Sequence, residues 1–408
     1  MEIKNKKKMK ITSVKPVICQ GGIRNFTLVK ITTDAGIVGW GEGSEWVRVL
    51  SCVKVIEFLE PMLIGEDPFN IEAIWQKIYI ASYVGGKDLN VALTGIETAL
   101  WDIVGKALDT PVYNLLGGRC RDKIRLYYDY CDAYGVGFCG TDTWSLGDTS
   151  LEGIAKQAKQ IKEKKFTALK LHPVGLPTRP DLTRSTSLKS IIDTTEKMKI
   201  VRKVVGDEIE ICMDANNRLD LYSSIRLAQA LEPYNLMFLE DPVRQDESAM
   251  TYRRIKESTS TPIGTGENLY NVWAFRNYLE IGALDVVLLD LSHCGGILQA
   301  RKIAALAEAF HLPIAPHNPN GPLAAIISAH FCASIPNFYA LEYYNPERET
   351  PWYDKIMDPP LKVVDGYLEL PTGPGWGVKI NEEEIAKHPY RESWYSGLSS
   401  VFEGVKLE

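Results

Sequence analysis

Short apolar runs that each end in a polar or ionisable residue recur along the middle of the chain, and this repeat constrains the fold most. From Asp214 onward the end residues follow one another at intervals of 23 to 27 positions, with segments of helical periodicity between them. Strands buried on both faces that alternate with helices are typical of a parallel α/β barrel. With residues 124–130 as a first strand, the count reaches the eight strands of a closed barrel. The later runs end at His172, Asp214, Glu240, Glu267, Asp290, His317 and Glu342.

The first part of the chain has a different pattern. Residues 10–45 alternate between apolar and polar with period two, which predicts an antiparallel meander, and residues 47–116 carry apolar residues three and four apart, which predicts a layer of helices. The predicted fold class is therefore α/β, a modified TIM (β/α) barrel with an N-terminal α+β capping domain. The predicted parts are a capping domain over residues 1–122, a catalytic barrel over 123–345, and a Pro/Gly-rich C-terminal segment over 346–408 that returns to the capping domain.

Length, charge and cysteine content narrow the class of protein. The 408 residues exceed one ordinary core and suit two domains or a large barrel with an attachment. The net charge of −6 argues against a general nucleic-acid or anionic-membrane surface. The apolar region 89–104 contains the charged residues Glu97 and Asp102, so we expect no membrane span. The eight cysteines are scattered without a C-x-x-C motif, which favours a reduced, cytoplasmic protein.

Three consecutive strand ends are carboxylates: Asp214, Glu240 and Glu267. Because the C-terminal ends of barrel strands meet at one mouth, these side chains should lie on adjacent strands, and their mutual repulsion calls for a bound cation. One such carboxylate could merely cap the next helix, but three in succession favour a metal site. Oxygen ligands without thiolate or imidazole suit Mg²⁺ better than zinc.

Candidate bases flank these carboxylates. Lys170 and His172 are alternate residues of one strand, so both should point into the mouth. Asp290 and His317 end neighbouring strands, where a hydrogen bond between carboxylate and imidazole would fix the tautomer and raise the basicity of the ring. Glu342 ends the last strand beside this dyad.

A metal ion between opposed bases suits the abstraction of a proton α to a carboxylate. The negative charge that develops on the enediolate oxygens must be balanced by the ion and by nearby donors. An acid then either returns a proton, which is racemisation or epimerisation, or expels a β-hydroxyl group, which is dehydration. The residues alone leave both outcomes open.

Distinctive motifs occur along nearly the whole chain, at Gly36–Glu42, Ala99–Lys106, Leu115–Gly118, Glu240–Pro242, Gly266–Glu267, Asp290–Gly296, Pro316–Pro322 and Pro371–Val378. They resemble those of the enolase superfamily, mandelate racemase subgroup, and within it the galactonate- and gluconate-type acid-sugar dehydratases. The resemblance implies that Asp214, Glu240 and Glu267 bind Mg²⁺, that Asp290 and His317 form the catalytic dyad, and that Glu342 helps to hold the substrate carboxylate or enediolate. It also implies a homo-oligomer.

Two positions depart from the family pattern. Racemase-type members have Lys-x-Lys on the second barrel strand, whereas this chain has Lys170-Leu171-His172. Either His172 is the second base, or it is a substrate ligand and Lys170 an electrophile. Galactonate and gluconate dehydratase-like members carry a histidine two residues after the first metal ligand, where this chain has Asn216. An amide cannot protonate a departing hydroxyl group, so in a dehydration His317 or His172 should also serve as the acid.

Substrate contacts are expected from Arg24, Trp46, Asn216 and His293. Arg24 could meet a distal carboxylate or hydroxyl groups of the substrate, or it could be a solvated loop residue. The aromatic residues of segment 127–144 could stack on a sugar or bury an interface. The insertion at residues 176–185 could bring Arg179 or Arg184 over the mouth, or be a plain loop.

The leading hypothesis is a Mg²⁺-dependent lyase that dehydrates a small acid sugar to a 2-keto-3-deoxy acid. The alternative is a racemase, epimerase or cycloisomerase acting on a sugar acid or its lactone, which Asn216 and bases on both faces would suit. A silent binding protein on an enzyme scaffold would have no physical need for the converging carboxylates, the dyad and Lys170 together. No phosphate-binding or dinucleotide motif is present in the sequence.

Overall fold

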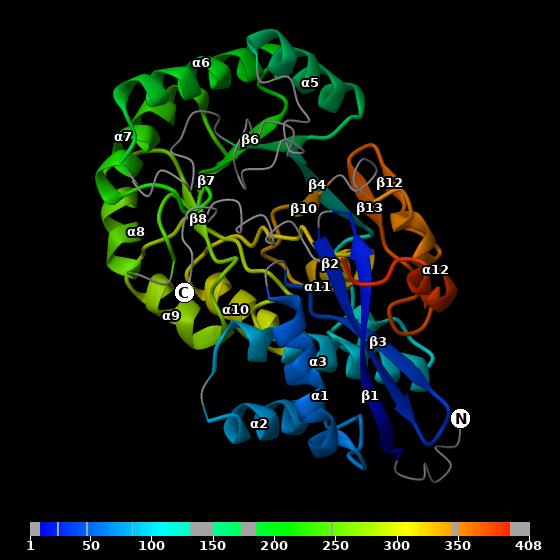
Figure 1. Ribbon diagram of the computed structural model, residues 1–408. Helices are drawn as coiled ribbons and strands as arrows, with labels where there is room; N and C mark the ends of the chain where they lie inside the picture. The colour runs from blue at the N-terminus through cyan, green and yellow to red at the C-terminus, as the bar shows by residue number, and fades with distance from the viewer. Residues whose placement is uncertain are drawn as a thin grey trace, which may run out of the picture.

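The computed structural model describes residues 9–22, 24–45, 48–83, 85–130, 150–172, 185–245, 248–344 and 350–391. Figure 1 shows the N-terminal part, in blue, beside a larger barrel in green and yellow. None of the helices in these ranges combines the length and the apolar character that a membrane span requires.

The capping domain is an antiparallel meander packed against helices, as its alternating sequence predicted. Its sheet has the order β1 (Ile11–Gly21), β2 (Arg24–Thr33), β3 (Val38–Glu42). A Cβ atom at Gly41 would overlap main-chain atoms of α3, so glycine lets β3 lie directly on that helix. The helices are α1 (Val49–Leu63), α2 (Ile71–Ala81), α3 (Lys87–Ala107) and α4 (Val112–Leu115).

Parallel strands form the barrel. They follow in the order β4 (Lys123–Tyr130), β5 (Ala168–Leu171), β6 (Glu210–Asp214), β7 (Phe238–Glu240), β8 (Ile263–Thr265) and β9 (Val286–Val287), and β10 (Leu341–Tyr344) pairs with β4. Parallel bridges from Val287 to Ile314 and from Ile314 to Phe338 close the circle. The closing strand runs two residues beyond Glu342, where we expected it to end, because Tyr343 and Tyr344 still pair with β4.

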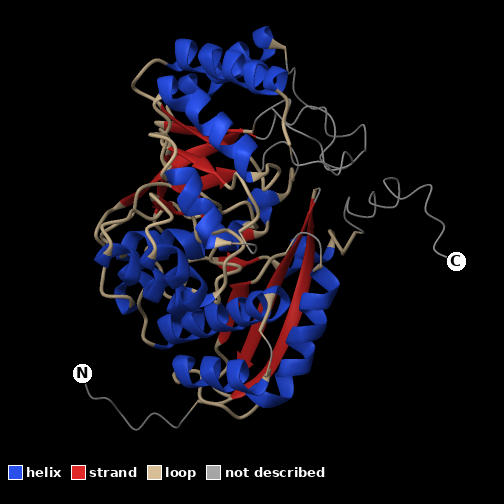
Figure 2. Ribbon diagram, turned by 90° about the vertical axis from the view of Figure 1, so that its left-hand side faces the viewer, coloured by secondary structure: helices blue, strands red, loops and turns tan. Residues whose placement is uncertain are grey.

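Helices cover the outside of the barrel, and α5 to α8 form an arc around the strands in Figure 1. The same alternation of an inner sheet and outer helices is visible in the turned view of Figure 2. Apolar side chains such as Phe238, Leu288 and Ala315 fill the interior between the strands. The helices are α5 (Leu151–Glu163), α6 (Leu188–Val205), α7 (Leu221–Leu231), α8 (Ala249–Lys256), α9 (Asn271–Glu280), α10 (Ile297–Ala309) and α11 (Pro322–Ser334).

The C-terminal segment contacts both larger parts. β13 (Tyr367–Glu369) pairs antiparallel with β4 of the barrel. In the capping domain, the Trp376 indole donates a hydrogen bond to the Trp40 carbonyl at 2.9 Å, and the Trp376 amide donates to Asp102. The domain boundaries at residues 122 and 345 stay predictions. The segment contains β11 (Met357–Asp358), β12 (Val363–Val364), β13 (Tyr367–Glu369), β14 (Lys379–Ile380) and α12 (Glu382–Ala386).

Two buried glutamates of the capping domain join it to the barrel. Glu97 of α3 accepts hydrogen bonds from the main-chain amides of Ile297 (3.0 Å) and Leu298 (2.9 Å) at the start of α10. Glu42 of β3 accepts from two amides at the start of α11, residues 321 and 324. The first amides of a helix have no partner inside it, and its N-terminus favours negative charge. The capping domain therefore completes the N-termini of two barrel helices.

Glu97 should make stability depend on pH. Burial raises its pKa from 4.5 to about 7, although the Leu298 amide, the Trp101 indole and the Ile297 amide lower it. Between these two values the folded protein binds a proton at Glu97 that the unfolded chain has lost, so this contribution to the unfolding free energy falls as pH rises and levels off above 7. The total fall is about 3 kcal/mol at most.

We therefore expect the difference in unfolding free energy between wild type and Glu97→Gln to change between pH 5 and pH 8, with wild type losing more as the pH rises. Denaturant unfolding of both proteins across this range is the measurement. Glu42, whose pKa burial also raises to about 7, is present in both proteins and cancels from the comparison. If the unfolding free energies of the two proteins change in parallel with pH, Glu97 does not titrate in this range.

Candidate active site

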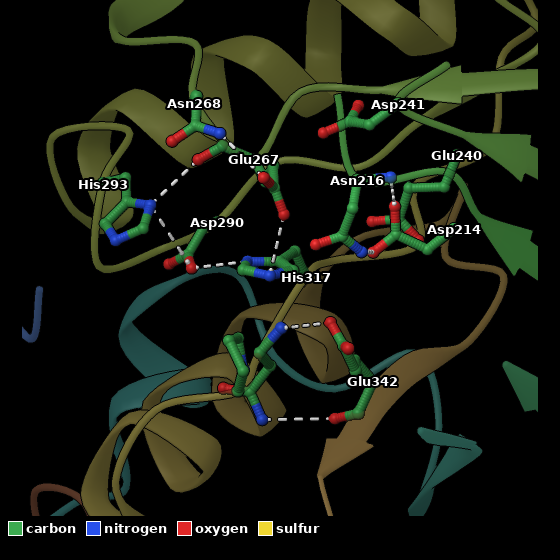
Figure 3. A network of polar contacts seen from close by, with 12 residues as sticks. Asp214, Asn216, Glu240, Asp241, Glu267, Asn268, Asp290, His293, His317 and Glu342 are labelled. Carbon is green, nitrogen blue, oxygen red and sulfur yellow. Dashed lines mark hydrogen bonds and ion pairs between the residues drawn. The ribbon is translucent and has the colours of Figure 1, made fainter. Parts of the chain in front are cut away.

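The predicted carboxylates lie at the C-terminal ends of adjacent strands. Asp214 and Glu240 are the last residues of β6 and β7 and are direct partners in the strand register. Glu267 follows β8 after Gly266, whose φ of 144° and contacts with Phe275 and Leu288 leave no room for a side chain. Figure 3 shows Asp214 and Glu240 side by side, with Glu267 turned towards His317.

Glu240 is fully buried, and its negative charge is only partly balanced by its surroundings. Among the described residues, neither of its carboxylate oxygens has a hydrogen-bond partner. The ammonium group of Lys170 lies 3.4 Å from Oε2. Burial raises the pKa of Glu240 well above its ordinary value, and the charges of Asp214 and Glu342 add to this effect, whereas Lys170 opposes it. Burying a carboxylate without hydrogen bonds is costly, so its environment suits a bound cation.

The other two carboxylates are engaged elsewhere. Oε2 of Glu267 lies 2.9 Å from Nε2 of His317, and Oε1 accepts a hydrogen bond from the Asn268 amide group at 2.7 Å. Asp214 accepts from the main-chain amide of Asn216 at 2.7 Å. With these side-chain positions, no group of three or more His, Cys, Asp or Glu residues in the described ranges could hold a metal ion. The predicted ligand set offers suitable oxygen donors, but the Glu267 side chain would have to turn away from His317.

Lys170 is the central cation of the mouth. Its ammonium group lies 2.5 Å from Oε1 of Glu342 and 4.0 Å from Oδ2 of Asp214, in addition to its contact with Glu240. Burial alone would lower the pKa of Lys170, but Glu240, Glu342 and Asp129 outweigh it and raise the pKa well above its ordinary value. Lys170 is therefore a fixed positive charge in this structure.

The expected contact between Asp290 and His317 is present. His317 Nδ1 lies 2.8 Å from Oδ2 of Asp290, and a parallel β-bridge joins the two residues. The Ser292 main-chain amide and the Asn320 side-chain amide also donate to Asp290, at 2.6 and 3.2 Å. Burial would lower the pKa of His317, but Glu267 and Glu342 raise it well above its ordinary value.

A second pair of carboxylate and imidazole was missed by the sequence analysis. His172 directly follows β5, and its Nε2 lies 2.7 Å from Oδ1 of Asp129 on β4. On the other side of the ring, Nδ1 lies 3.1 Å from the amide nitrogen of Asn216. Burial would raise the pKa of Asp129, but the charges of His172 and Lys170 lower it. The available signal was a lone aspartate near the end of an aromatic strand.

His293 lies at the edge of the mouth. Its Nδ1 is 2.9 Å from the Glu267 carbonyl oxygen and 3.5 Å from the Asp290 carboxylate. On the capping-domain side, Nε2 lies 3.9 Å from Glu45, which pairs with the Lys87 ammonium group at 2.5 Å. Lys87 also donates to the side-chain oxygen of Asn268 in the barrel at 3.2 Å. It was not among the predicted site residues, because nothing in the sequence of α3 indicates that its first residue reaches the barrel.

Arg24 is buried, with 5% of its surface exposed, so its interpretation as a solvated loop residue is wrong. Its guanidinium donates to the Pro319 carbonyl and lies over the Tyr344 ring at 4.2 Å, which joins the capping domain to the loop after His317. A substrate contact of Arg24 stays a prediction.

Part of the predicted aromatic segment belongs to the core. Tyr127 packs inside the barrel, and Tyr128 contacts Phe166, so neither ring presents an open face at the surface. The remaining predicted substrate residues, Trp46, Arg179 and Arg184, and the aromatic residues between 131 and 144, lie outside the described residues.

Comparison with known proteins identifies the family. The model for the mandelate racemase / muconate lactonizing enzyme N-terminal domain matches residues 8–117, and the enolase C-terminal domain-like model matches residues 153–384. The chain therefore belongs to the mandelate racemase/muconate lactonizing enzyme family of the enolase superfamily, and the protein is an enzyme of that superfamily. The predicted family and fold class are confirmed.

Relatives and solved structures agree with this assignment. D-galactonate dehydratase of Pectobacterium atrosepticum is 37% identical over 366 residues, which cover 88% of this chain and 90% of the relative. D-xylonate dehydratase of Haloferax volcanii is 33% identical over 385 residues, covering 93% and 88%. The crystal structure of a mandelate racemase/muconate lactonizing enzyme-like protein from Rubrobacter xylanophilus has a TM-score of 0.86 and 31% identity, covering 95% of this chain and 98% of that one.

The contacts of Lys170 predict a strong effect on stability. In metal-free protein, Lys170→Met should lower the unfolding free energy by about 3–5 kcal/mol, because it leaves buried carboxylates without their counter-charge. The double variant with Glu342→Gln should recover part of this loss, since it also removes a repelling charge. Denaturant unfolding of the four proteins in the cycle measures the coupling, and purely additive effects would contradict the pairing of Lys170 with Glu342.

Proposed function

We propose that the protein is a Mg²⁺-dependent sugar-acid dehydratase, a hydro-lyase that converts a small acid sugar to a 2-keto-3-deoxy acid. The observation that carries the proposal is the His317 imidazole, which Asp290 holds at Nδ1 while Nε2 faces the carboxylate of Glu267. The dehydratases of Pectobacterium and Haloferax, which are named for D-galactonate and D-xylonate, support the same reaction type.

In this proposal Asp214, Glu240 and Glu267 hold the metal ion. The buried oxygens of Glu240, which accept no hydrogen bond within the described ranges, are the structural support for a cation there. Bound Mg²⁺ would supply Lewis-acid stabilisation of the negative charge on the carboxylate oxygens of the substrate. Lys170 adds a buried positive charge at the same place.

His317 would remove the proton from the α-carbon of the substrate. Because Asp290 accepts the Nδ1 proton, Nε2 is the atom that takes the α-proton as the Cα–H bond breaks, once Glu267, which raises the pKa of His317 in this structure, has turned away from the ring. The electron pair of that bond forms the enediolate, which expels the β-hydroxyl group as the Cβ–O bond breaks. His317 then returns its proton to the departing hydroxyl, so water leaves and the enol product tautomerises to the 2-keto acid.

A racemase or epimerase is the second candidate, with cycloisomerisation as a variant of the same chemistry. The observation that favours it is the second pair of carboxylate and imidazole, Asp129 with His172, which offers another basic group at the mouth. Proton return to the α-carbon, rather than loss of the β-hydroxyl, would follow if His172 reached the substrate.

The function is tested by incubating the protein with Mg²⁺ in D₂O and a panel of acid sugars and lactones that includes D-xylonate and D-galactonate. Proton NMR and a 2-keto acid assay follow the products. A 2-keto-3-deoxy acid is the expected result. Deuterium at the α-carbon without keto product would instead support the epimerase, and no reaction across the panel would oppose both.

We expect His317→Asn to reduce dehydration on the active substrate by at least about 10²-fold, because asparagine cannot accept the α-proton. The 2-keto acid assay measures this loss. His311→Asn, at a surface histidine after α10, is the matched control and should keep wild-type activity. Equal turnover by wild type and His317→Asn would exclude His317 as the base.

Glu240→Gln should abolish both turnover and the stabilisation of the fold by Mg²⁺. A ligand that binds only the folded state raises its stability, by about 2.7 kcal/mol at a concentration of 100 times Kd. Thermal unfolding with and without Mg²⁺ should therefore show a shift in wild type that Glu240→Gln lacks. Glu210→Gln, at the opposite end of β6 from Asp214, is the control and should keep the shift. A full shift in Glu240→Gln would rule out this metal assignment.

A further inference from the structure

A continuous chain of hydrogen bonds crosses the ends of three neighbouring strands. It begins at Asp129 on β4, passes through His172 after β5 and Asn216 after β6, and ends at Asp214, the last residue of β6. The first two contacts measure 2.7 and 3.1 Å. Asp129, His172 and Asp214 are each only 5% exposed and therefore largely shielded from water, whereas Asn216 is half-buried.

The chemistry of the groups sets the direction of every proton in the chain. An ionised carboxylate only accepts hydrogen bonds, so Nε2 of His172 carries the proton that faces Asp129. In the tautomer with its proton on Nε2, the ring has a lone pair on Nδ1, which accepts one hydrogen from the Asn216 amide group. The second hydrogen of the same amide group is donated to Oδ2 of Asp214. Both ends of the chain are thus carboxylates, and Asn216 is the only side chain that can donate in two directions.

The main chain at Asn216 reinforces this arrangement. Its φ of 54° lies in the left-handed region, which asparagine adopts more readily than most residues. In this conformation the main-chain amide of Asn216 also donates to Asp214, at Oδ1 and 2.7 Å. Both oxygens of the Asp214 carboxylate are therefore fixed by one residue.

We propose that Asp129 is a positioning residue of the active site that fixes the tautomer of His172 and, through Asn216, the orientation of the Asp214 carboxylate. The effect on Asp214 rests on the proposed function, in which Asp214 is a Mg²⁺ ligand. Residues that orient metal ligands from outside the coordination sphere typically affect metal affinity 10- to 100-fold. In this role His172 orients Asn216 and Asp214, whereas His317 transfers the proton of the substrate. A single imidazole that transfers protons favours dehydration over epimerisation.

The first measurement is the tautomer of His172 in metal-free protein. NMR of protein labelled with ¹⁵N-histidine observes the six imidazoles of the chain, and the signals missing from His172→Gln assign His172. Wild type should show the proton on Nε2. Asp129→Asn should show a mixture of tautomers, because an amide can donate to Nε2 as well as accept from it. Asp122→Asn, at an exposed carboxylate just before β4, should match wild type.

The second measurement is Mg²⁺ affinity by calorimetry. Asp129→Asn and Asn216→Ala should each weaken binding by about 10- to 100-fold, and only Asp129→Asn should change the tautomer of His172. If Asp129→Asn fails to fold, the Mg²⁺ affinity of Asn216→Ala decides whether the hydrogen-bond chain orients the Asp214 carboxylate.

An unchanged tautomer in folded Asp129→Asn, or unchanged affinity in Asn216→Ala, would overturn the proposal. The proposed function and the positioning role of Asp129 can be disproved separately. If wild type binds no Mg²⁺, the proposed function fails, and the tautomer measurement alone decides whether Asp129 positions His172.

Discussion

The mouth of the barrel depends on Lys170, a single buried ammonium group among crowded carboxylates. The Coulomb repulsion between neighbouring carboxylates is large in a medium of low dielectric constant, and burial removes the water that would screen it. Lys170 contacts Glu342, Glu240 and Asp214, which come from three different strands. Its charge therefore offsets part of a repulsion that the parallel strand order imposes, while the oxygens of Glu240 accept no hydrogen bond from the part of the chain that the structure describes.

The capping domain also contacts the segments that follow the strand ends at the mouth of the barrel. Glu42 and Glu97 bind the first amides of α11 and α10, the helices that follow the loops carrying His317 and Asp290. Arg24 holds the His317 loop through the Pro319 carbonyl. Because the same loops carry the dyad, the contacts between the domains also fix the position of the candidate base. Stability at this interface and geometry at the site are therefore coupled.

The periodic strand ends made most of the site predictable. Parallel strands of a barrel share one polarity, so a terminal Asp214 or Glu240 had to reach the mouth whatever the details of packing. The sequence could not show which carboxylate would meet which cation, because those contacts depend on side-chain torsions. The contact of Glu267 with His317, in place of a convergence with the other carboxylates, is such a case.

Residues outside the periodic pattern were missed for a related reason. Asp129 lies one position before the end of β4, where alternation alone does not distinguish a site residue from a satisfied core carboxylate. Lys87 begins a helix, a position that is unfavourable for a cation unless a carboxylate such as Glu45 lies beside it. Both depend on partners distant in sequence, which only the folded arrangement identifies.

The two imidazoles at the mouth differ in what surrounds them. Each is held by an aspartate on a neighbouring strand, but the second nitrogen of His172 meets an amide that donates to it, whereas the second nitrogen of His317 meets a carboxylate. An amide donor keeps its proton and can only orient the ring, while a flexible glutamate can turn away and leave Nε2 to a substrate. In the proposed mechanism, Asn216 therefore leaves His172 to orient its neighbours and His317 to transfer the proton.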